Sequence, residues 1–351
     1  MTRNEIAEAI ARDDTIENQD LTGIDLTGLD LSGARFEQCD LSGADFRGAA
    51  IHRTGFRDCV LHGAEMSGAD LTQVLWMHMD LNGVKLAGAK LEKAVLTGAS
   101  LVDADLTGAD LTRAVLDGAV LDRARLAKAL LFRTVLVQTS LQAADLTGAD
   151  LTRAIFLKAD LTGARLKQIR AHKTFLRECA LAGQDFSGCE FSCVQVGGAD
   201  LTGANFAGAD IDRSNFMEAV LTDADFSAVK AFGAVFMAAD LRRARFSRAQ
   251  LANACFESAR LDGADFTAAR LDQALMARCS CVGARFANAD CNCADFSHAD
   301  LTATDFSHAG LFRANMHRAK EEHTVWDGAT RSLALETDPD LAEAEDWGGR
   351  K

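Results

Sequence analysis

The stretch 105–121 reads DLTGADLTRAVLDGAVL, and it nearly repeats itself every five residues. Counted in fives from Ile16 to Met316, the same position carries Leu, Phe, Ile, Val or Met with few exceptions and without insertion or deletion. A small residue, most often Ala, stands two places before each of these central positions. The remaining three places carry mostly Asp, Thr, Ser, Gly and Arg. One repeating unit therefore accounts for most of the chain.

Neither regular secondary structure explains a period of five. An α-helix turns about 100° per residue, so residues five apart would scatter around its surface. In a straight strand side chains alternate between faces, and an odd period would send successive leucines to opposite sides. The pattern fits a chain that turns after each short extended piece, with the central residue and the small residue both pointing inward. Such coils must stack through backbone hydrogen bonds.

The units ADLTG and ADLTR resemble the motif of the pentapeptide-repeat family, Ala-(Asp/Asn)-Leu-X-X, and the resemblance covers most of the chain. It implies an all-β fold, a right-handed, four-sided parallel β-helix with four repeats in each coil. On that basis residues 16–320 form a solenoid of about fifteen coils.

The repeat divides the chain into three predicted parts. Thr2 and Glu5 form a capping-box pattern that opens a short helix, with Ile6 and Ile10 on the side that covers the first coil. The C-terminal part ends in an acidic tail, residues 336–351, which is expected to be mobile or to bind a partner. The predicted parts are an N-terminal capping helix (1–15), the solenoid (16–320) and a C-terminal cap with the tail (321–351).

The stretch 170–198 departs most from the repeat. Ala171 stands at a central position, and Gln184 stands at a position that should point inward. Two interpretations stay open: a local irregularity or bend of the solenoid, or ordinary drift of the repeat.

Composition argues against several classes of function. The net charge is −14, and no apolar run approaches the ~18–20 residues of a membrane span. The first residues are too acidic for a secretory signal, so a cytoplasmic protein is expected. Most of the ten cysteines fall on inward positions, and none has the spacing of a zinc site. We expect no cofactor, no metal and, because leucines fill a narrow solenoid, no catalytic pocket.

One set of outward positions is unexpectedly apolar. Positions twenty residues apart should stack on neighbouring coils, and six of them form what we call the apolar column: Leu75, Val95, Val115, Val135, Ile155 and Phe175. Beside it runs a basic column: Lys93, Arg113, Arg133, Arg153 and Lys173. Phe132 adds an aromatic side chain that we expect to be exposed. A contiguous exposed apolar patch usually marks an interface. The alternative is that these positions carry β-branched residues only because such residues favour strand conformation.

These observations favour a non-enzymatic scaffold or adaptor that binds another protein, or a second copy as a homodimer, through the two columns. The opening MTRNE and the later WDGAT are similar to stand-alone pentapeptide proteins of bacterial type VI secretion clusters, which implies a secretion-system component or effector as partner.

The alternative is a DNA-mimicking gyrase inhibitor or protector of the quinolone-resistance type. Basic residues such as Lys85, Arg125 and Arg165 interrupt the acidic stripe that such a mimic needs. Direct nucleic-acid binding is disfavoured by the net acidic body.

Overall fold

The fold was examined in a computed structural model, which describes residues 1–348. The chain divides into two compact units, Met1–Ala180 and a second that begins at Leu181. The boundary falls inside the stretch 170–198, but an irregularity or bend of the solenoid there stays a prediction.

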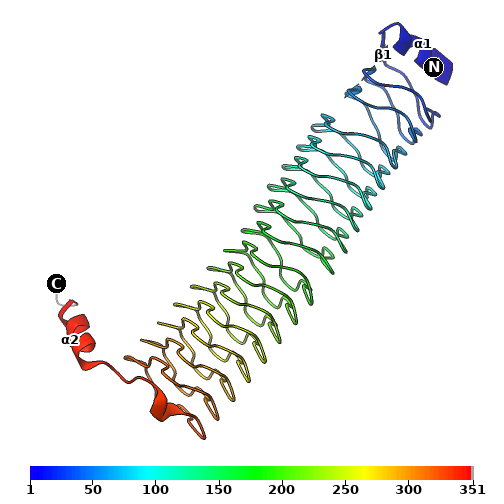
Figure 1. Cartoon of the computed structure of the whole chain (residues 1–351). Coiled ribbons are helices and arrows are strands. Elements are labelled where there is room, and N and C mark those ends of the chain that lie inside the picture. The colour runs from blue at the N-terminus through cyan, green and yellow to red at the C-terminus, as the bar shows by residue number, and fades with distance from the viewer. Residues whose placement is uncertain (349–351) are drawn as a thin grey trace. The chain divides into compact units, whose positions relative to one another are not determined.

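A short helix closes the N-terminal end of the first unit (Figure 1). Helix α1 (Arg3–Ala11) begins after Thr2, whose hydroxyl accepts a hydrogen bond from the Glu5 amide at 3.4 Å. The Glu5 carboxylate in turn accepts the Thr2 amide at 2.7 Å, which completes the predicted capping box. Ile6 is fully buried, as expected. Ala9 is the second buried residue, whereas Ile10 lies at the edge of the helix and stays half-exposed.

Parallel pairing between residues twenty apart builds each unit. The strands β1 (Thr15–Glu17), β2 (Arg35–Glu37) and β3 (Gly55–Arg57) pair in that register, so that Phe36 lies between Ile16 and Phe56. Beyond them single bridges repeat the register every five residues, giving four bridge positions in each twenty-residue coil. The backbone hydrogen-bonding groups of one coil are thereby satisfied by the next. The four-sided β-helix is confirmed.

A tight turn joins one side of the coil to the next. The Ala114 amide donates to the Leu111 carbonyl at 2.9 Å, and the residue before Ala114, Arg113, has a φ of +60°. Gly108 occupies the equivalent position five residues earlier, with a φ of +65°. Glycine adopts this left-handed conformation freely, whereas other residues pay roughly 1–2 kcal/mol for it. Each corner with a long side chain therefore carries a backbone cost.

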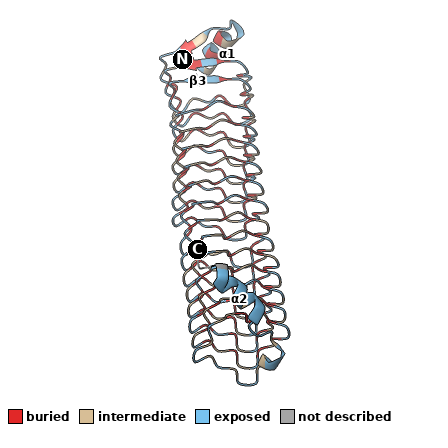
Figure 2. Ribbon diagram, turned by 90° about the vertical axis from the view of Figure 1, so that its left-hand side faces the viewer, coloured by how far each residue is buried: buried red, intermediate tan, exposed pale blue. Residues whose placement is uncertain are grey.

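Central and small residues fill the interior, as Figure 2 shows by the buried positions that recur along the coils. Inward cysteines share this burial, which raises the pKa of the Cys59 thiol to about 11 and that of Cys179 to about 12. Among the cysteines, Cys293 is exposed and Cys193 and Cys255 are half-buried, as their outward positions predict.

In the second unit aromatic rings stack along the interior. Neighbouring rings lie 4.7–4.9 Å apart and within 12° of parallel. This spacing is the distance between successive coils, so each ring covers the one before it. The stack consists of Phe206, Phe226, Phe246, Phe266, Phe286, Phe306 and Trp326.

The bridge pattern continues past residue 320, since Val325 and Leu335 still pair with residues twenty before them. A 3-10 turn, η1 (Arg331–Leu333), and helix α2 (Pro339–Gly348) follow. The acidic tail is thus helical over most of its length, and residues 349–351 lie outside the described part. Helix α2 lies beside the last coils (Figure 1). In the part of the chain that the structure describes, no helix is both long and apolar enough to cross a membrane.

Candidate functional site

The apolar column forms a continuous ladder on one side of the first unit. Each member bridges to the next, from Leu75 through Val95 to Phe175. Parallel neighbours on one ladder place their side chains in direct contact. The structure therefore brings together the six residues that the sequence singled out.

Exposure along this column is uneven. Leu75 is 70% exposed and Phe175 is 45% exposed, whereas Val95, Val115 and Val135 are only half-exposed. The middle valines are covered by their neighbours on the coils above and below. Phe132, expected to be exposed, is also half-buried, and the guanidinium carbon of Arg133 lies 5.3 Å from its ring centroid. The predicted patch is therefore most accessible at its two ends.

The basic column occupies the corner beside this ladder. All five residues are exposed and adopt the left-handed conformation, with φ between +56° and +60°. Within the described residues none of the five forms an ion pair with a carboxylate. On another ladder Lys85 does form such a pair, 3.5 Å from Glu65, and so does Arg125, 3.4 Å from Asp105. Uncompensated positive charge therefore lies next to the apolar side chains.

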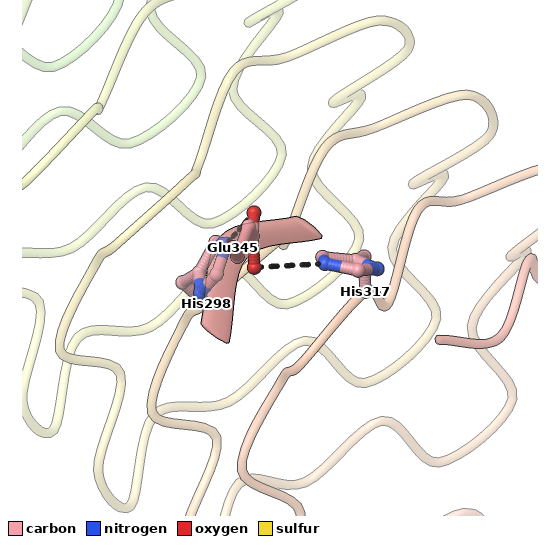
Figure 3. Close-up of side chains that lie close together, drawn as sticks. All are labelled: His298, His317 and Glu345. Carbon is pink, nitrogen blue, oxygen red and sulfur yellow. Dashed lines mark hydrogen bonds and ion pairs between the residues drawn. The ribbon is translucent and has the colours of Figure 1, made fainter. Parts of the chain in front are cut away.

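A second cluster, in the last coils of the other unit, was not found by sequence reasoning. Figure 3 shows the Glu345 side chain of α2 between His298 and His317. Its carboxylate oxygens lie 3.1 Å from Nε2 of His298 and 3.3 Å from Nε2 of His317. Nε of Arg318 lies 3.1 Å from the same carboxylate. The spacing of twenty residues between His298 and Arg318 indicates their proximity, but no period places Glu345 against them.

The protonation of this cluster follows from its hydrogen bonds. Nδ1 of His317 accepts the backbone amide of Asp338 at 3.1 Å, so the neutral ring carries its proton on Nε2 and donates it to Glu345. Loss of hydration acts to raise the pKa of Glu345, but hydrogen bonds from His317 and His298 outweigh it and lower the pKa.

The same three side chains offer metal-binding atoms within 4.8 Å of one another, and two imidazoles with a carboxylate are a zinc-type donor set. A metal on His317 would require its Nε2 without a proton, which conflicts with the bond from Asp338. The Arg318 guanidinium also supplies positive charge where a cation would sit. We therefore interpret the cluster as a hydrogen-bonded ion-pair network.

Solved structures of similar proteins include HetL, a regulator of heterocyst differentiation from the cyanobacterium Nostoc sp. strain PCC 7120. It is 22% identical with a TM-score of 0.20, and the alignment covers 96% of this chain and 98% of HetL. QnrB1, a plasmid-mediated fluoroquinolone resistance protein, is 14% identical with a TM-score of 0.30, over 67% of this chain and 97% of QnrB1. TM-scores this low do not establish a common overall shape. A search of curated protein sequences returned no significant match.

Family models give the clearer result. The model described as a pentapeptide repeat region matches residues 29–106 and 209–286. The model of eight pentapeptide copies matches residues 99–136, 129–168 and 279–318. Together these matches extend over well more than half of the chain, in both compact units. The chain belongs to the pentapeptide-repeat proteins.

Proposed function

We propose that this protein is a non-enzymatic scaffold that binds an acidic protein partner across the apolar and basic columns of its first unit. The observation that carries the proposal is the contrast in charge pairing. Lys85 and Arg125 pair with acids on their own ladders, whereas the basic column has no such partner among the described residues.

The chemistry of the partner follows from this contrast. Five uncompensated cations beside apolar side chains complement a surface that offers carboxylates next to Leu, Val or aromatic residues. The accessible ends of the apolar column, Leu75 and Phe175, are suited to act as anchors, because large apolar side chains dominate binding energy. A component or effector of a type VI secretion system is the partner class we favour, on the similarity of the opening MTRNE and of WDGAT at 326–330.

The test is affinity capture from lysate of the native host. Wild type is compared with the triple variant Val115→Asp, Val135→Asp, Ile155→Asp, which places carboxylates in the middle of the apolar column. The matched control carries three acids on another ladder: Val60→Asp, Ser100→Asp and Val120→Asp. A protein retained by wild type and by the control, but lost from the triple variant, supports the proposal. Equal capture by all three, with folding intact by circular dichroism, refutes it.

Gyrase protection remains the alternative. A duplex mimic needs an unbroken row of negative charge, and the pairing of Glu65 with Lys85 and of Asp105 with Arg125 neutralises such a row. We therefore expect no effect on gyrase supercoiling at micromolar protein.

A further inference from the structure

Polar contacts between α2 and the last coils centre on Glu345. Arg318 makes two further contacts with α2. Its guanidinium donates a hydrogen bond to the Ala342 carbonyl at 2.6 Å and lies 2.7 Å from the Asp346 carboxylate. We call the residues of the coils that contact the helix the α2 seat: His298, His317 and Arg318. The seat is basic, whereas α2 carries Asp340, Glu343, Glu345 and Asp346.

Apolar contact contributes little to this attachment. Leu341 is 48% exposed and Trp347 is 79% exposed, although both belong to the docked helix. A cavity of about 320 Å³ remains at the junction, bordered by Leu275, Arg278, His298 and Leu341. The side chains of His298, Arg318 and Glu345 stay 30–33% exposed, so solvent screens their ion pairs. Ion pairs that solvent screens contribute only modestly to stability, so a helix held mainly by them can detach.

The seat residues belong to the stacked coils. The His298 amide donates to the His317 carbonyl at 2.8 Å, a bond between successive coils, and Arg318 follows His317 directly in the chain. His298 and Arg318 stand on corners of consecutive coils, with φ of +60° and +52°. The stacked coils therefore present one guanidinium and two imidazoles at fixed spacing to a carboxylate on a helix.

We propose that the α2 seat is a docking site for an acidic amphipathic helix of a partner protein, and that α2 occupies the site in cis until the partner displaces it. The partner helix carries Leu and Glu one turn apart, as Leu341 and Glu345 are in α2, followed directly by a second acid. Residues four apart share one face of a helix, so the Leu reaches the cavity while the Glu reaches His298 and His317. This site is independent of the columns in the first unit.

The test uses the full chain and a fluorescein-labelled peptide of residues 334–348. In wild type the tethered α2 competes with the free peptide for the α2 seat. Because the tether gives α2 a high effective concentration, it excludes the peptide. Glu345→Ala weakens the tethered helix, so this variant should bind the peptide at least tenfold more tightly than wild type. Glu343→Ala is the matched control, because Glu343 forms no ion pair within the described residues, and it should behave as wild type.

Two further probes define the recognition. The peptide with Glu345→Gln should bind the Glu345→Ala protein at least tenfold more weakly, a comparison that folding of the protein cannot affect. A designed helix of unrelated sequence that keeps only the Leu, Glu and Asp spacing should bind like the original peptide.

The proposal is overturned if the Glu345→Ala protein binds no peptide at millimolar concentration, or if the glutamine peptide binds equally well. It is also overturned if the Glu345→Ala protein forms a dimer that the peptide dissociates, because the occupant is then α2 of a second copy. Light scattering with and without peptide distinguishes these results.

Discussion

Two opposite substitutions at equivalent corners test the backbone geometry of the coil. Gly108 and Arg113 both occupy the left-handed position of a turn, with φ of +65° and +60°. A Cβ at Gly108 would meet no atom within 4 Å, so its only cost is the backbone conformation. That conformation costs an L-residue roughly 1–2 kcal/mol. We expect Gly108→Ala to lower the free energy of unfolding by about 1–2 kcal/mol and Arg113→Gly to raise it by about 1 kcal/mol.

Urea unfolding followed by far-ultraviolet circular dichroism measures both changes, provided that the slope with denaturant is unaltered. Thr112→Ala serves as the control, because its outward side chain makes no contact that the coil requires, and its midpoint should stay near that of wild type. A loss of stability in both corner variants, or no change in either, would refute the account of the corners. Of the two variants, Arg113→Gly is the more stringent test, because it removes a long side chain and is still expected to stabilise the protein.

Acid and thiol chemistry give two more predictions. The Thr147 hydroxyl donates to Asp145 at 2.6 Å and, with the Thr147 amide, lowers the pKa of Asp145. This stabilisation is present above the unfolded pKa of about 3.9 and is lost as pH falls through the lower folded pKa. Thr147→Val should therefore lower the urea midpoint more at pH 7 than at pH 2. An equal loss at both pH values would contradict this. With a thiol reagent at neutral pH, Cys293 should react in the folded protein while Cys59 and Cys179 react only after unfolding; rapid labelling of all three would show that the coils open.

The sequence alone determined the coil. An apolar residue every fifth position and a small residue two places before it admit few backbone paths. The stacking of residues twenty apart came from the resemblance to the pentapeptide-repeat family, which implies four repeats per coil. Bridges such as Val115 to Val135 and the capping box at Thr2 and Glu5 were therefore predictable, because both depend on spacing along the chain. The same spacing of twenty residues identified the apolar and basic columns.

Only the tertiary structure decided how accessible those columns are and what α2 contacts. Val115 is half-covered because neighbours on adjacent coils shield it. Whether Arg113 forms an ion pair depends on side-chain reach rather than on register, and it forms none among residues 1–348. Glu345 lies outside the repeat, so no period relates it to His298 and His317. The repeat dictates contacts within the solenoid because every coil presents the same geometry to the next, whereas the docking of a helix depends on matching charges that sequence spacing does not encode.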